Sequence, residues 1–349
     1  MDWDAMSESG SAGSSGDTSG DGSDATQGDP GKPKIVGAVS GTQVPRYAGS
    51  STFARVPEID RVSDYDVAIL GVPFDTGTSY RPGARFGPMA VRQSSRHLRP
   101  GHHVELGITP FEQIQVVDAG DVPVTPFNID EALGQIQNHA AGLITPDHRV
   151  VAIGGDHTIA LPMLRAVTRV HGPVALLHFD AHLDTWNTYF NTPTTHGTVF
   201  RRAFEEGLLI EDHSMHVGIR GPIYGAHDLI DDARFGFRTI RTTDVDNMGV
   251  PAVIEAIHER IDDLPVYVSI DIDVLDPAFA PGTGTPEAGG LTSRELLAAL
   301  RGLTGLNIVG ADVVEVAPAY DHAELTTVAA ATVVFDLITL LARRPSNLA

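Results

Sequence analysis

The hydrophobic and polar positions of this 349-residue chain form two kinds of segment that alternate along its length. Short apolar runs bounded by turn residues predict β-strands at residues 67–72, 114–117, 150–153, 174–179, 215–219, 266–270 and 308–314. Apolar residues with helical spacing predict helices at residues 129–143, 161–170, 253–261, 294–303 and 323–341. We therefore predict an α/β fold, a single three-layer domain with a mostly parallel central sheet of about eight strands flanked by helices.

The N-terminal segment has a different composition from the rest of the chain. Residues 1–31 contain seven acidic residues, seven serines and seven glycines, and no Lys or Arg. Their few apolar side chains cannot offset the entropy lost on ordering the chain. We predict an acidic, Gly/Ser-rich disordered tail at residues 1–33 and one folded domain at residues 45–344.

Composition excludes several classes of function. The chain has no Cys, so disulfides, thiolate metal sites and thiol nucleophiles are ruled out. Its formal charge of -21 argues against binding to nucleic acid or to anionic lipid, which both require clustered basic residues. No apolar span of 18 residues and no signal-peptide pattern stands out, so we expect a cytoplasmic protein that contacts no membrane.

Polar residues follow three of the predicted strands. The run at 150–153 leads into GGDHT, the run at 174–179 into DAHLD, and the run at 266–270 into DID. In an extended chain, residues two apart point to the same side. Because ligands of parallel sheets bind beyond the carboxyl ends of the strands, we expect these side chains to form one site.

Four carboxylates and two imidazoles of these segments are candidate ligands. Packed together without cations, the carboxylates would repel one another or share protons, and the set matches one or two divalent ions. Taken alone, the histidine and the DID pair could equally be packing or capping residues, whereas the three segments together favour a metal site. The predicted ligands are His157, Asp180, His182, Asp184, Asp271 and Asp273. His178 lies inside an apolar run, and we predict a hydrogen-bonded core histidine or one that supports a ligand.

These motifs resemble the ureohydrolase family of arginases, agmatinases and related amidinohydrolases. The resemblance rests on GGDHT at 154–158, DAHLDT at 180–185, SIDIDVLDPAFAPGTGTPEAGGL at 269–291, GVPFDTGTSYRPGARFGP at 71–88, DAGDV at 118–122 and THGTVFRRAFEEG at 195–207. It implies an arginase-like fold and two divalent ions, most often Mn²⁺, with a hydroxide between them. Ni²⁺, Co²⁺ and Zn²⁺ stay possible, because the ligand set does not select one metal.

The resemblance also assigns roles to the ligands. His157, Asp180, Asp184 and Asp271 would bind one ion, and Asp180, His182, Asp271 and Asp273 the other. The hydroxide that bridges the metals would attack the guanidino carbon, and urea and an amine would leave. Asp184 would orient the hydroxide, His196 would carry a proton to the amine, and Glu315 would pair with the guanidinium. The family resemblance further suggests a homotrimer or homohexamer.

The residues of these motifs are most similar to those of bacterial agmatinases. This resemblance implies agmatine as the substrate, urea and putrescine as the products, and a role in polyamine biosynthesis. Trp186 stands where arginases have a small polar residue, which disfavours arginine, and Glu287 would suit the ammonium end of agmatine. Guanidinobutyrase is the main alternative, and guanidinopropionate, arginine or guanidine are other candidate substrates. For a substrate carboxylate, Arg81 or Arg85 would be the partner, although a structural role is favoured for both.

Two other functions stay open from the residues. A metal-dependent deacetylase with a related fold would not explain the second pair of carboxylates, Asp271 and Asp273. An inactive partner subunit of a mixed oligomer would be expected to have lost some of the site residues, and all are present here.

Overall fold

The computed structural model describes residues 34–343, so the tail predicted at 1–33 lies outside the described residues. Eight parallel strands form one sheet in the order β2-β1-β3-β8-β7-β4-β5-β6. Their bounds are β1 Val67–Val72, β2 Val116–Asp121, β3 Arg149–Gly154, β4 Ala175–Phe179, β5 Ser214–Ile219, β6 Phe237–Arg241, β7 Pro265–Asp271 and β8 Asn307–Val314. The predicted α/β class is confirmed, and every strand pair is parallel.

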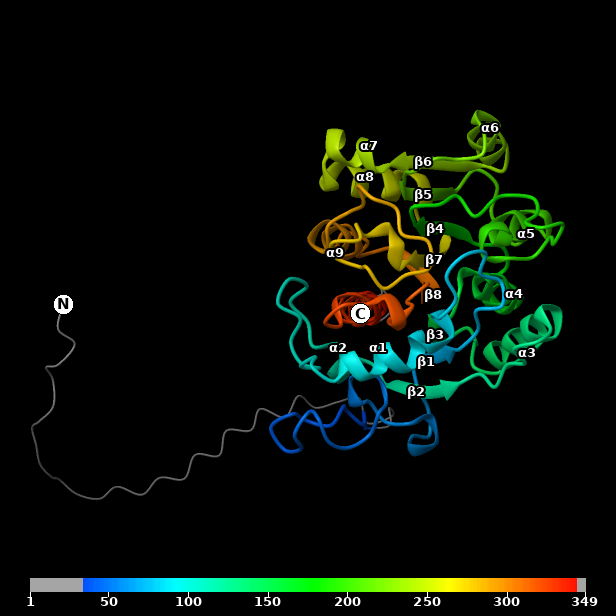
Figure 1. Ribbon diagram of the computed structural model, residues 1–349. Coiled ribbons are helices and arrows are strands. Elements are labelled where there is room, and N and C mark those ends of the chain that lie inside the picture. Colours follow the sequence, from blue (N-terminus) through cyan, green and yellow to red (C-terminus); the bar gives the residue numbers. More distant parts are fainter. Residues whose placement is uncertain (1–33, 344–349) are drawn as a thin grey trace, which may run out of the picture. The chain divides into compact units, whose positions relative to one another are not determined.

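Helices cover both faces of the sheet (Figure 1). On one face α3 packs on α4 and α4 on α5, and on the other α1 packs on α10, α10 on α9, α9 on α8 and α8 on α7. Helix α6 contacts β6 at the edge of the sheet. The bounds are α1 Gly87–Ser95, α2 Pro110–Gln113, α3 Ile129–Ala141, α4 Ala160–His171, α5 Val199–Glu205, α6 Ala226–Arg234, α7 Thr242–Met248, α8 Val250–Ile261, α9 Ser293–Arg301 and α10 Leu325–Ala342.

Short 3-10 helices complete the connections. They are η1 Phe53–Arg55, η2 Ile59–Arg61, η3 Ala84–Phe86, η4 His157–Ile159, η5 His196–Thr198, η6 Ile272–Val274 and η7 Pro318–Tyr320. Residues 35–343 belong to one compact unit. Its contacts begin before the predicted domain limit at residue 45, because Val36 donates its N–H to the side chain of Gln115 at 2.7 Å. The limits 45 and 344 themselves stay a prediction.

The core consists of two apolar layers, one under each set of helices. Along β1, Val67 and Ile69 belong to the core beneath α8, α9 and α10, whereas Ala68 and Leu70 belong to the core beneath α3 and α4. Strands of a parallel sheet that is covered on both sides are apolar at every position. This explains why the strands read as continuous hydrophobic runs in the sequence.

Helix α10 contradicts the expectation that no apolar span of 18 residues exists. It has 18 residues with a mean hydropathy of 2.0, and 78% of this window is buried inside the structure. The helix packs against β8, α1 and α9, so its apolar residues belong to the core of the domain. Its buried Asp336 is paired with His103 at 2.8 Å and with Arg301 at 2.8 Å.

The edge strand β6 was missing from the predicted elements, as were α1, α2, α5, α6 and α7. Strand β6 has the sequence FRTIR, in which two of the five side chains are exposed arginines. The missed helices have nine residues or fewer. Short elements hold too few apolar positions for their period to be recognised.

The middle of the sheet brings the three polar segments together. Strands β3, β8, β7 and β4 are consecutive in the sheet although they are far apart in the chain. The segments that follow β3, β7 and β4 therefore lie at neighbouring positions on the carboxyl edge. The strand order thus creates the site that the sequence could only suggest.

Gly155 lies against the backbone at the end of β3, where a Cβ atom would come within 1.8 Å of the Phe74 carbonyl oxygen. We expect Gly155→Ala to lower the free energy of unfolding by about 3 kcal/mol or more, because backbone cannot move aside as a side chain can. The control is Gly134→Ala in α3, where a Cβ would meet nothing within 4 Å. Denaturant unfolding should show Gly134→Ala more stable by about 0.5–1 kcal/mol. Equal stability of Gly155→Ala and the wild type would contradict the structure.

Candidate metal centre and the cavity beside it

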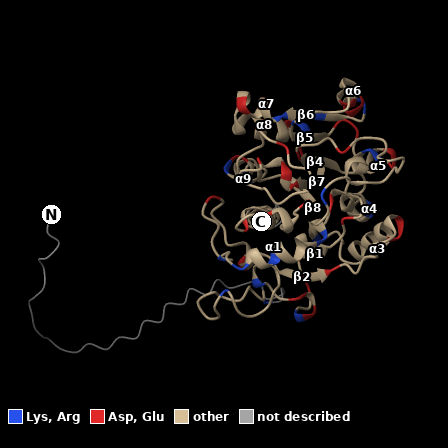
Figure 2. Cartoon of the chain, viewed as in Figure 1, with Lys and Arg blue, Asp and Glu red and all other residues tan. Residues whose placement is uncertain are grey.

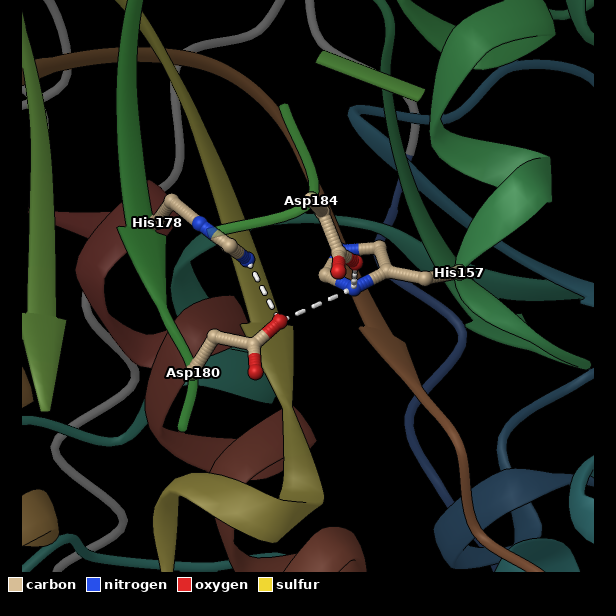
Figure 3. A group of neighbouring side chains, drawn as sticks. All are labelled: His157, His178, Asp180 and Asp184. Carbon is tan, nitrogen blue, oxygen red and sulfur yellow. Dashed lines mark hydrogen bonds and ion pairs between the residues drawn. The ribbon is translucent and has the colours of Figure 1, made fainter. Parts of the chain in front are cut away.

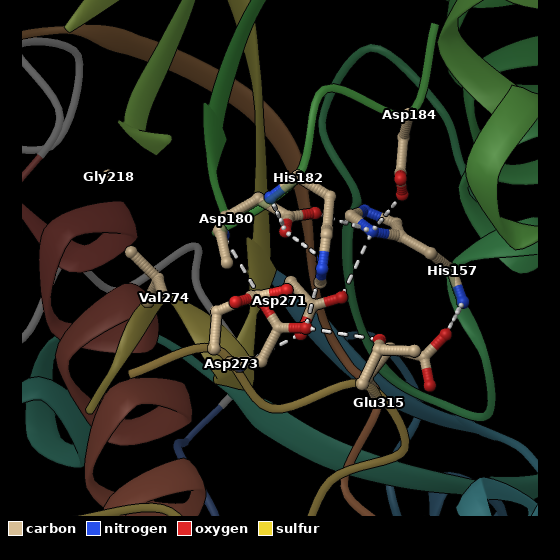
Figure 4. Close-up of polar contacts among 12 residues, drawn as sticks. His157, Asp180, His182, Asp184, Gly218, Asp271, Asp273, Val274 and Glu315 are labelled. Carbon is tan, nitrogen blue, oxygen red and sulfur yellow. Dashed lines mark hydrogen bonds and ion pairs between the residues drawn. The ribbon is translucent and has the colours of Figure 1, made fainter. Parts of the chain in front are cut away.

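Three strand ends supply the acidic and imidazole side chains of the candidate centre (Figure 4). His157 begins η4 after β3, Asp180 follows β4, and Asp271 is the last residue of β7. Two of the acids also cap their own turns, because Asp180 accepts the N–H of His182 at 2.6 Å and Asp271 accepts that of Asp273 at 2.8 Å. The Asp-x-His and Asp-x-Asp spacing therefore builds the loops as well as the site.

The first group of ligand atoms surrounds Nδ1 of His157. The distances from this nitrogen are 3.2 Å to Oδ2 of Asp180, 3.0 Å to Oδ2 of Asp184 and 3.3 Å to Oδ2 of Asp271. All four side chains are buried. None of the three oxygens is aligned for a hydrogen bond with the nitrogen, which is buried without a hydrogen-bond partner.

The second group surrounds Nδ1 of His182, which is 3.2 Å from Oδ1 of Asp180 and 3.2 Å from Oδ2 of Asp273. Asp180 thus offers one oxygen to each group, as expected for a shared ligand. Asp271, which the family resemblance also assigns to both ions, contacts His157 but has no recorded contact with His182. The six predicted ligands therefore converge, and Asp180 lies between the two histidines.

The hydrogen bonds behind His157 show which of its nitrogens is available. Its Nε2 is 2.8 Å from Oγ of Ser269, and Ser269 donates its own hydroxyl proton to Asp312 at 2.6 Å. The serine oxygen therefore accepts from Nε2–H, so the lone pair of a neutral His157 is on Nδ1. A buried lone pair that faces three carboxylate oxygens is unfavourable, and a cation between them would satisfy all four atoms. The residues fit a bound divalent ion.

The electrostatics of the site indicate the same need for positive charge. Burial lowers the pKa of His157, but the close carboxylates of Asp180, Asp184 and Asp271 outweigh it and hold this pKa well above the usual value, so without a cation the ring would tend to take up a proton. Burial and the neighbouring charges of Asp273 and Asp180 raise the pKa of Asp271 well above its usual range. Divalent cations would remove this repulsion without protonating the carboxylates. Acidic residues are not confined to the site, since they also lie on the helices of both layers (Figure 2).

Two site residues have strained backbone. Asp184 has a φ of 55° and Glu315 a φ of 62°, in the left-handed region that non-glycine residues rarely adopt. Such conformations cost on the order of 1–3 kcal/mol each and are typical of functional sites. Asp184 is one of the ligands predicted from the strand-end motifs, and Glu315 is the carboxylate that the family resemblance assigns to the guanidinium.

His196 lies beside the metal cluster at the start of η5. Its Nδ1 is 3.2 Å from Oε1 of Glu315, an oxygen that also accepts the N–H of His157 at 2.9 Å. Ser79 donates its backbone N–H to Nε2 of His196 at 3.1 Å, and the Ser79 hydroxyl is 2.7 Å from the same nitrogen. Burial lowers the pKa of His196, but the hydrogen bond and charge of Glu315 raise it overall to about 9. A pKa of about 9 favours the protonated ring at neutral pH, and the added proton would be on Nε2, where it would replace the bond that the Ser79 N–H donates in this structure.

A cavity of about 500 Å³ opens next to the cluster. His182, Asp184 and Asp271 lie on its wall, and so does His196. Glu315 is buried and is not one of the lining residues, so it lies behind His196. The cavity thus gives a small molecule access to the ligands and to one face of His196.

The other residues that line the cavity are mainly aromatic and charged. The rings of Trp186, Tyr189 and Tyr224 pack edge to face, with centroids 5.6–6.0 Å apart. Glu287 and Arg81 also line the cavity. The Arg81 guanidinium lies 5.4 Å from the ring of Tyr80 and 5.2 Å from that of Tyr320.

Several residues that were predicted to lie near the site without being metal ligands can be compared with the structure. Arg85 is hydrogen-bonded to Asp75 and is not a lining residue, in agreement with the structural role favoured for it. His178 is buried and hydrogen-bonded, also as predicted. Trp186 and Glu287, selected as substrate-binding candidates, both line the cavity.

The residues that orient His157 and His196 through hydrogen bonds were not predicted from the sequence. Asp156 accepts the N–H of Gly77 at 2.7 Å and so holds the turn that carries Ser79 against His196. Ser269 and Asp312 orient His157. A carboxylate inside the apolar run at 308–314 was a visible signal for Asp312, whereas nothing local distinguishes Ser79.

Comparisons with known proteins agree with this geometry. The arginase family model matches residues 65–339. A guanidinopropionase of Pseudomonas aeruginosa is 44% identical over 306 residues, which cover 86% of this chain and 94% of that protein. An agmatinase of Salmonella paratyphi B is 43% identical over 283 residues, covering 81% of this chain and 89% of that protein. The structure of proclavaminate amidino hydrolase from Streptomyces clavuligerus is similar with a TM-score of 0.82 at 43% identity, covering 86% of this chain and 99% of that one.

Metal binding should change the stability of the protein in a way that depends on Asp271. Mn²⁺ at 100 times its dissociation constant should raise the free energy of unfolding of the wild type by about 2.7 kcal/mol, and a chelator should reverse this gain. Asp271→Asn should lose most of the gain, yet be at least as stable as the wild type without metal, because one buried like-charge repulsion is removed. Thermal unfolding with and without Mn²⁺ measures both effects. An equal Mn²⁺ gain in the two proteins would count against Asp271 as a ligand.

Proposed function

Since the chain belongs to the arginase family and is a ureohydrolase, we propose that its substrate is agmatine, which it cleaves to urea and putrescine. The observation that carries this proposal is the buried cluster of carboxylates and imidazoles that opens into a cavity beside His196. Family membership also sets aside the deacetylase alternative. Because the site residues are all present, an active enzyme is favoured over an inactive partner subunit.

The residues would hold two divalent ions. His157, Asp180, Asp184 and Asp271 would bind one, and Asp180, His182, Asp271 and Asp273 the other. Bound divalent ions lower the pKa of water and so supply a hydroxide nucleophile near neutral pH. Mn²⁺ is our first choice, because four of the six ligands are hard carboxylates, and Ni²⁺, Co²⁺ and Zn²⁺ are alternatives.

The side chains around the cluster divide the remaining tasks. Asp184 lies at the boundary of cluster and cavity, where its carboxylate would orient the nucleophile. His196 would hold a proton on Nε2 and donate it to the departing amine nitrogen, which leaves poorly unless protonated. Glu315 positions His196 through Oε1. Its Oε2 accepts no hydrogen bond from residues 34–343, and a guanidinium N–H could pair with it only by passing His196, because Glu315 does not line the cavity.

The acidic and aromatic residues among the lining of the cavity favour a substrate with a cationic end group. Glu287 forms no ion pair among the described residues, and the rings of Trp186, Tyr189 and Tyr224 line the same space. A carboxylate and aromatic faces both attract an alkylammonium group. This combination supports agmatine, and it disfavours arginine, whose α-carboxylate would approach Glu287.

Arg81 supports a second candidate, a guanidino acid such as guanidinobutyrate or guanidinopropionate. Its guanidinium lines the cavity and has no ion-pair partner in the described part of the chain. A substrate carboxylate could pair with it. The similarity to a guanidinopropionase supports this candidate, while the two aromatic contacts of Arg81 explain how it is held without a substrate.

His196→Ala tests the proton-transfer role. We expect kcat for urea release to fall about 10²–10⁴-fold, the usual range for loss of a proton carrier, while metal content stays unchanged. The matched control is His258→Ala. This half-buried histidine is hydrogen-bonded to the carbonyl of Gly302 and is not part of the candidate site. Its kcat should equal that of the wild type. An unchanged rate in His196→Ala would assign the proton transfer to another group.

A substrate panel tests the end-group assignment. Agmatine, arginine, guanidinobutyrate, guanidinopropionate and guanidine should be assayed for urea with Mn²⁺ and with Ni²⁺. We expect the highest kcat/KM with agmatine and a loss of roughly 10-fold or more in Glu287→Gln, since a charge-assisted contact is worth about 1.5–3 kcal/mol. Arg81→Gln should leave agmatine turnover unchanged. A higher kcat/KM for a guanidino acid, lost in Arg81→Gln, would replace agmatine by the second candidate.

The assembly and location of the protein stay proposals. We propose a homotrimer or homohexamer in the cytoplasm, and neither the fold nor the comparisons address these points.

A further inference from the structure

The end of strand β5 lies next to the candidate metal centre and contributes none of the six candidate ligands. Asp180 and Asp184, which face His157, both follow β4 (Figure 3). Strand β5 is the neighbour of β4 in the sheet. The first residue after β5 is Arg220, whose backbone N–H donates at 3.0 Å to the carbonyl of Ala181, which stands between two candidate ligands in the chain. The end of β5 therefore contacts one of the ligand loops directly.

The guanidinium of Arg220 binds carbonyl oxygens of two further loops at once. Its Nη2 donates to the carbonyl of Asp273 at 2.6 Å and to that of Glu287 at 2.7 Å, and its Nη1 donates to Val274 at 3.1 Å. Longer contacts of 3.2–3.3 Å reach the carbonyls of Gly218, Leu275 and, through Nε, Glu287. A planar group with five N–H donors in fixed geometry is suited to bridging several acceptors. Arg220 therefore ties the loop of the candidate ligand Asp273 to the backbone of Glu287.

Arg220 holds one wall of the cavity without reaching the cavity itself. Its recorded side-chain hydrogen bonds all go to carbonyl oxygens, and it forms no ion pair with a carboxylate of residues 34–343. It is not one of the lining residues, whereas Pro222, Ile223 and Tyr224, which follow closely in the chain, are. Glu287 lines the same cavity. The guanidinium thus acts on the main chain behind the residues that a substrate would meet.

Gly221 leaves the space that the side chain of Glu287 occupies. Its φ is 73°, and a Cβ atom there would lie 2.6 Å from Cδ and 2.7 Å from Oε2 of Glu287. The carboxylate therefore lies directly against the main chain of Gly221. Any other residue would be strained at this φ, and its side chain would displace the carboxylate. Arg220 and Gly221 thus fix the backbone and the side chain of the same residue.

We propose that Arg220 and Gly221 are positioning residues that set where the carboxylate of Glu287 meets the end group of the substrate. Arg220 holds the Glu287 backbone against the loop of Asp273, so the end-group partner is fixed relative to the metal centre. Gly221 gives the carboxylate its place at the cavity wall. This inference rests on the proposed function, because it takes Glu287 as the partner of a substrate ammonium.

The expected effect is on the preference for a charged end group. A charge-assisted hydrogen bond requires a short and directed contact, so a displaced carboxylate would lose it. Agmatine and butylguanidine have the same guanidino group and the same carbon chain, and they differ in the terminal ammonium. The ratio of their kcat/KM values, measured at saturating Mn²⁺, therefore isolates the contribution of Glu287 from that of the metal centre.

Gly221→Ala tests the placement of the carboxylate. It should lower the agmatine-to-butylguanidine ratio about 10-fold or more, as Glu287→Gln should, because the charge-assisted contact is lost in both. The matched control is Gly120→Ala in β2, since Gly120 has the same φ of 73° but a Cβ there would meet nothing within 4 Å. The control should unfold at a lower denaturant concentration than the wild type and keep the wild-type ratio. An equal fall of the ratio in Gly120→Ala would reflect general destabilisation and overturn the role of Gly221.

Combining two substitutions separates positioning of Glu287 from other effects of Gly221. In Glu287→Gln there is no charge to misplace, so adding Gly221→Ala should change the ratio little further. If the two losses multiply instead, Gly221 acts on the substrate through another residue, and the proposal is wrong for this position.

Arg220→Met tests the tie between the two loops. It should lower the same ratio and also lower Mn²⁺ affinity about 10–100-fold, because the loop of Asp273 is released as well. Asp276 accepts the N–H of Gly289 at 2.7 Å and that of Gly290 at 3.2 Å, and this second tie should keep the variant folded. Arg220→Lys retains three donors and should lie between the wild type and Arg220→Met in both measurements.

The matched control for Arg220 is Arg260→Met. Arg260 is another half-buried arginine that donates to a backbone carbonyl, that of Gly236 at 2.6 Å, and it is not part of the candidate site. Its removal should leave the ratio and Mn²⁺ affinity unchanged. A wild-type ratio in Arg220→Met, or equal losses in Arg220→Met and Arg260→Met, would overturn the role of Arg220.

Failure of the proposed function gives a different result. If agmatine releases no urea, or if Glu287→Gln leaves the ratio unchanged, the end-group proposal fails. The positioning role is then decided without a substrate. A crystal structure of Gly221→Ala should show the Glu287 carboxylate displaced from its wild-type position, and Mn²⁺ affinity should fall in Arg220→Met alone of the two arginine variants. An unmoved carboxylate, or the same Mn²⁺ affinity in Arg220→Met and Arg260→Met, would refute it.

Discussion

The strongest physical constraint on this structure is the mutual repulsion of four carboxylates, which the fold holds close together at the carboxyl edge of one sheet. Asp180, Asp184, Asp271 and Asp273 are buried together around two imidazole nitrogens, and their charges must be compensated. The rest of the fold supplies the rigidity that this requires. The central strands are buried on both faces, and the turns that carry the acids are closed by hydrogen bonds from the same acids to nearby N–H groups. Divalent cations then convert an unfavourable cluster into a site for hydrolysis.

The cluster is supported in several directions by side chains that are not ligands. Ser269 and Asp312 direct the lone pair of His157 toward the carboxylates, and Glu315 joins the backbone of His157 to the ring of His196. Through Glu315, the proposed proton carrier His196 and the candidate metal ligand His157 are linked. In the proposed mechanism, a displacement of either histidine would disturb metal binding and proton transfer together. Such support explains why a buried polar network can be retained in a core that is otherwise apolar.

The cavity brings the candidate metal centre and the residues that could select a substrate into one space. His182, Asp184, Asp271 and His196 line it, and so do Glu287, Arg81 and three aromatic rings. In the proposed reaction the first group acts on the guanidino group. The second group would meet the other end of the substrate, where an ammonium and a carboxylate require opposite charges. The presence of both an acidic and a basic residue there is the reason why substrate identity depends on experiment.

The sequence by itself determined the fold class, the catalytic motifs and the six candidate ligands. The signals for the fold class and for the ligands are local. Strands that are buried on two faces are mainly apolar along their length, and Asp-x-His and Asp-x-Asp spacing places side chains on one side of the chain. Only the tertiary structure decided the rest. It decided that α10, with a composition suited to a membrane, is a core helix, that Glu315 lies behind His196, and that Ser79 and Arg220 contact residues of the site. These facts depend on contacts between residues far apart in the chain, which are created when β3, β8, β7 and β4 become neighbours in the sheet.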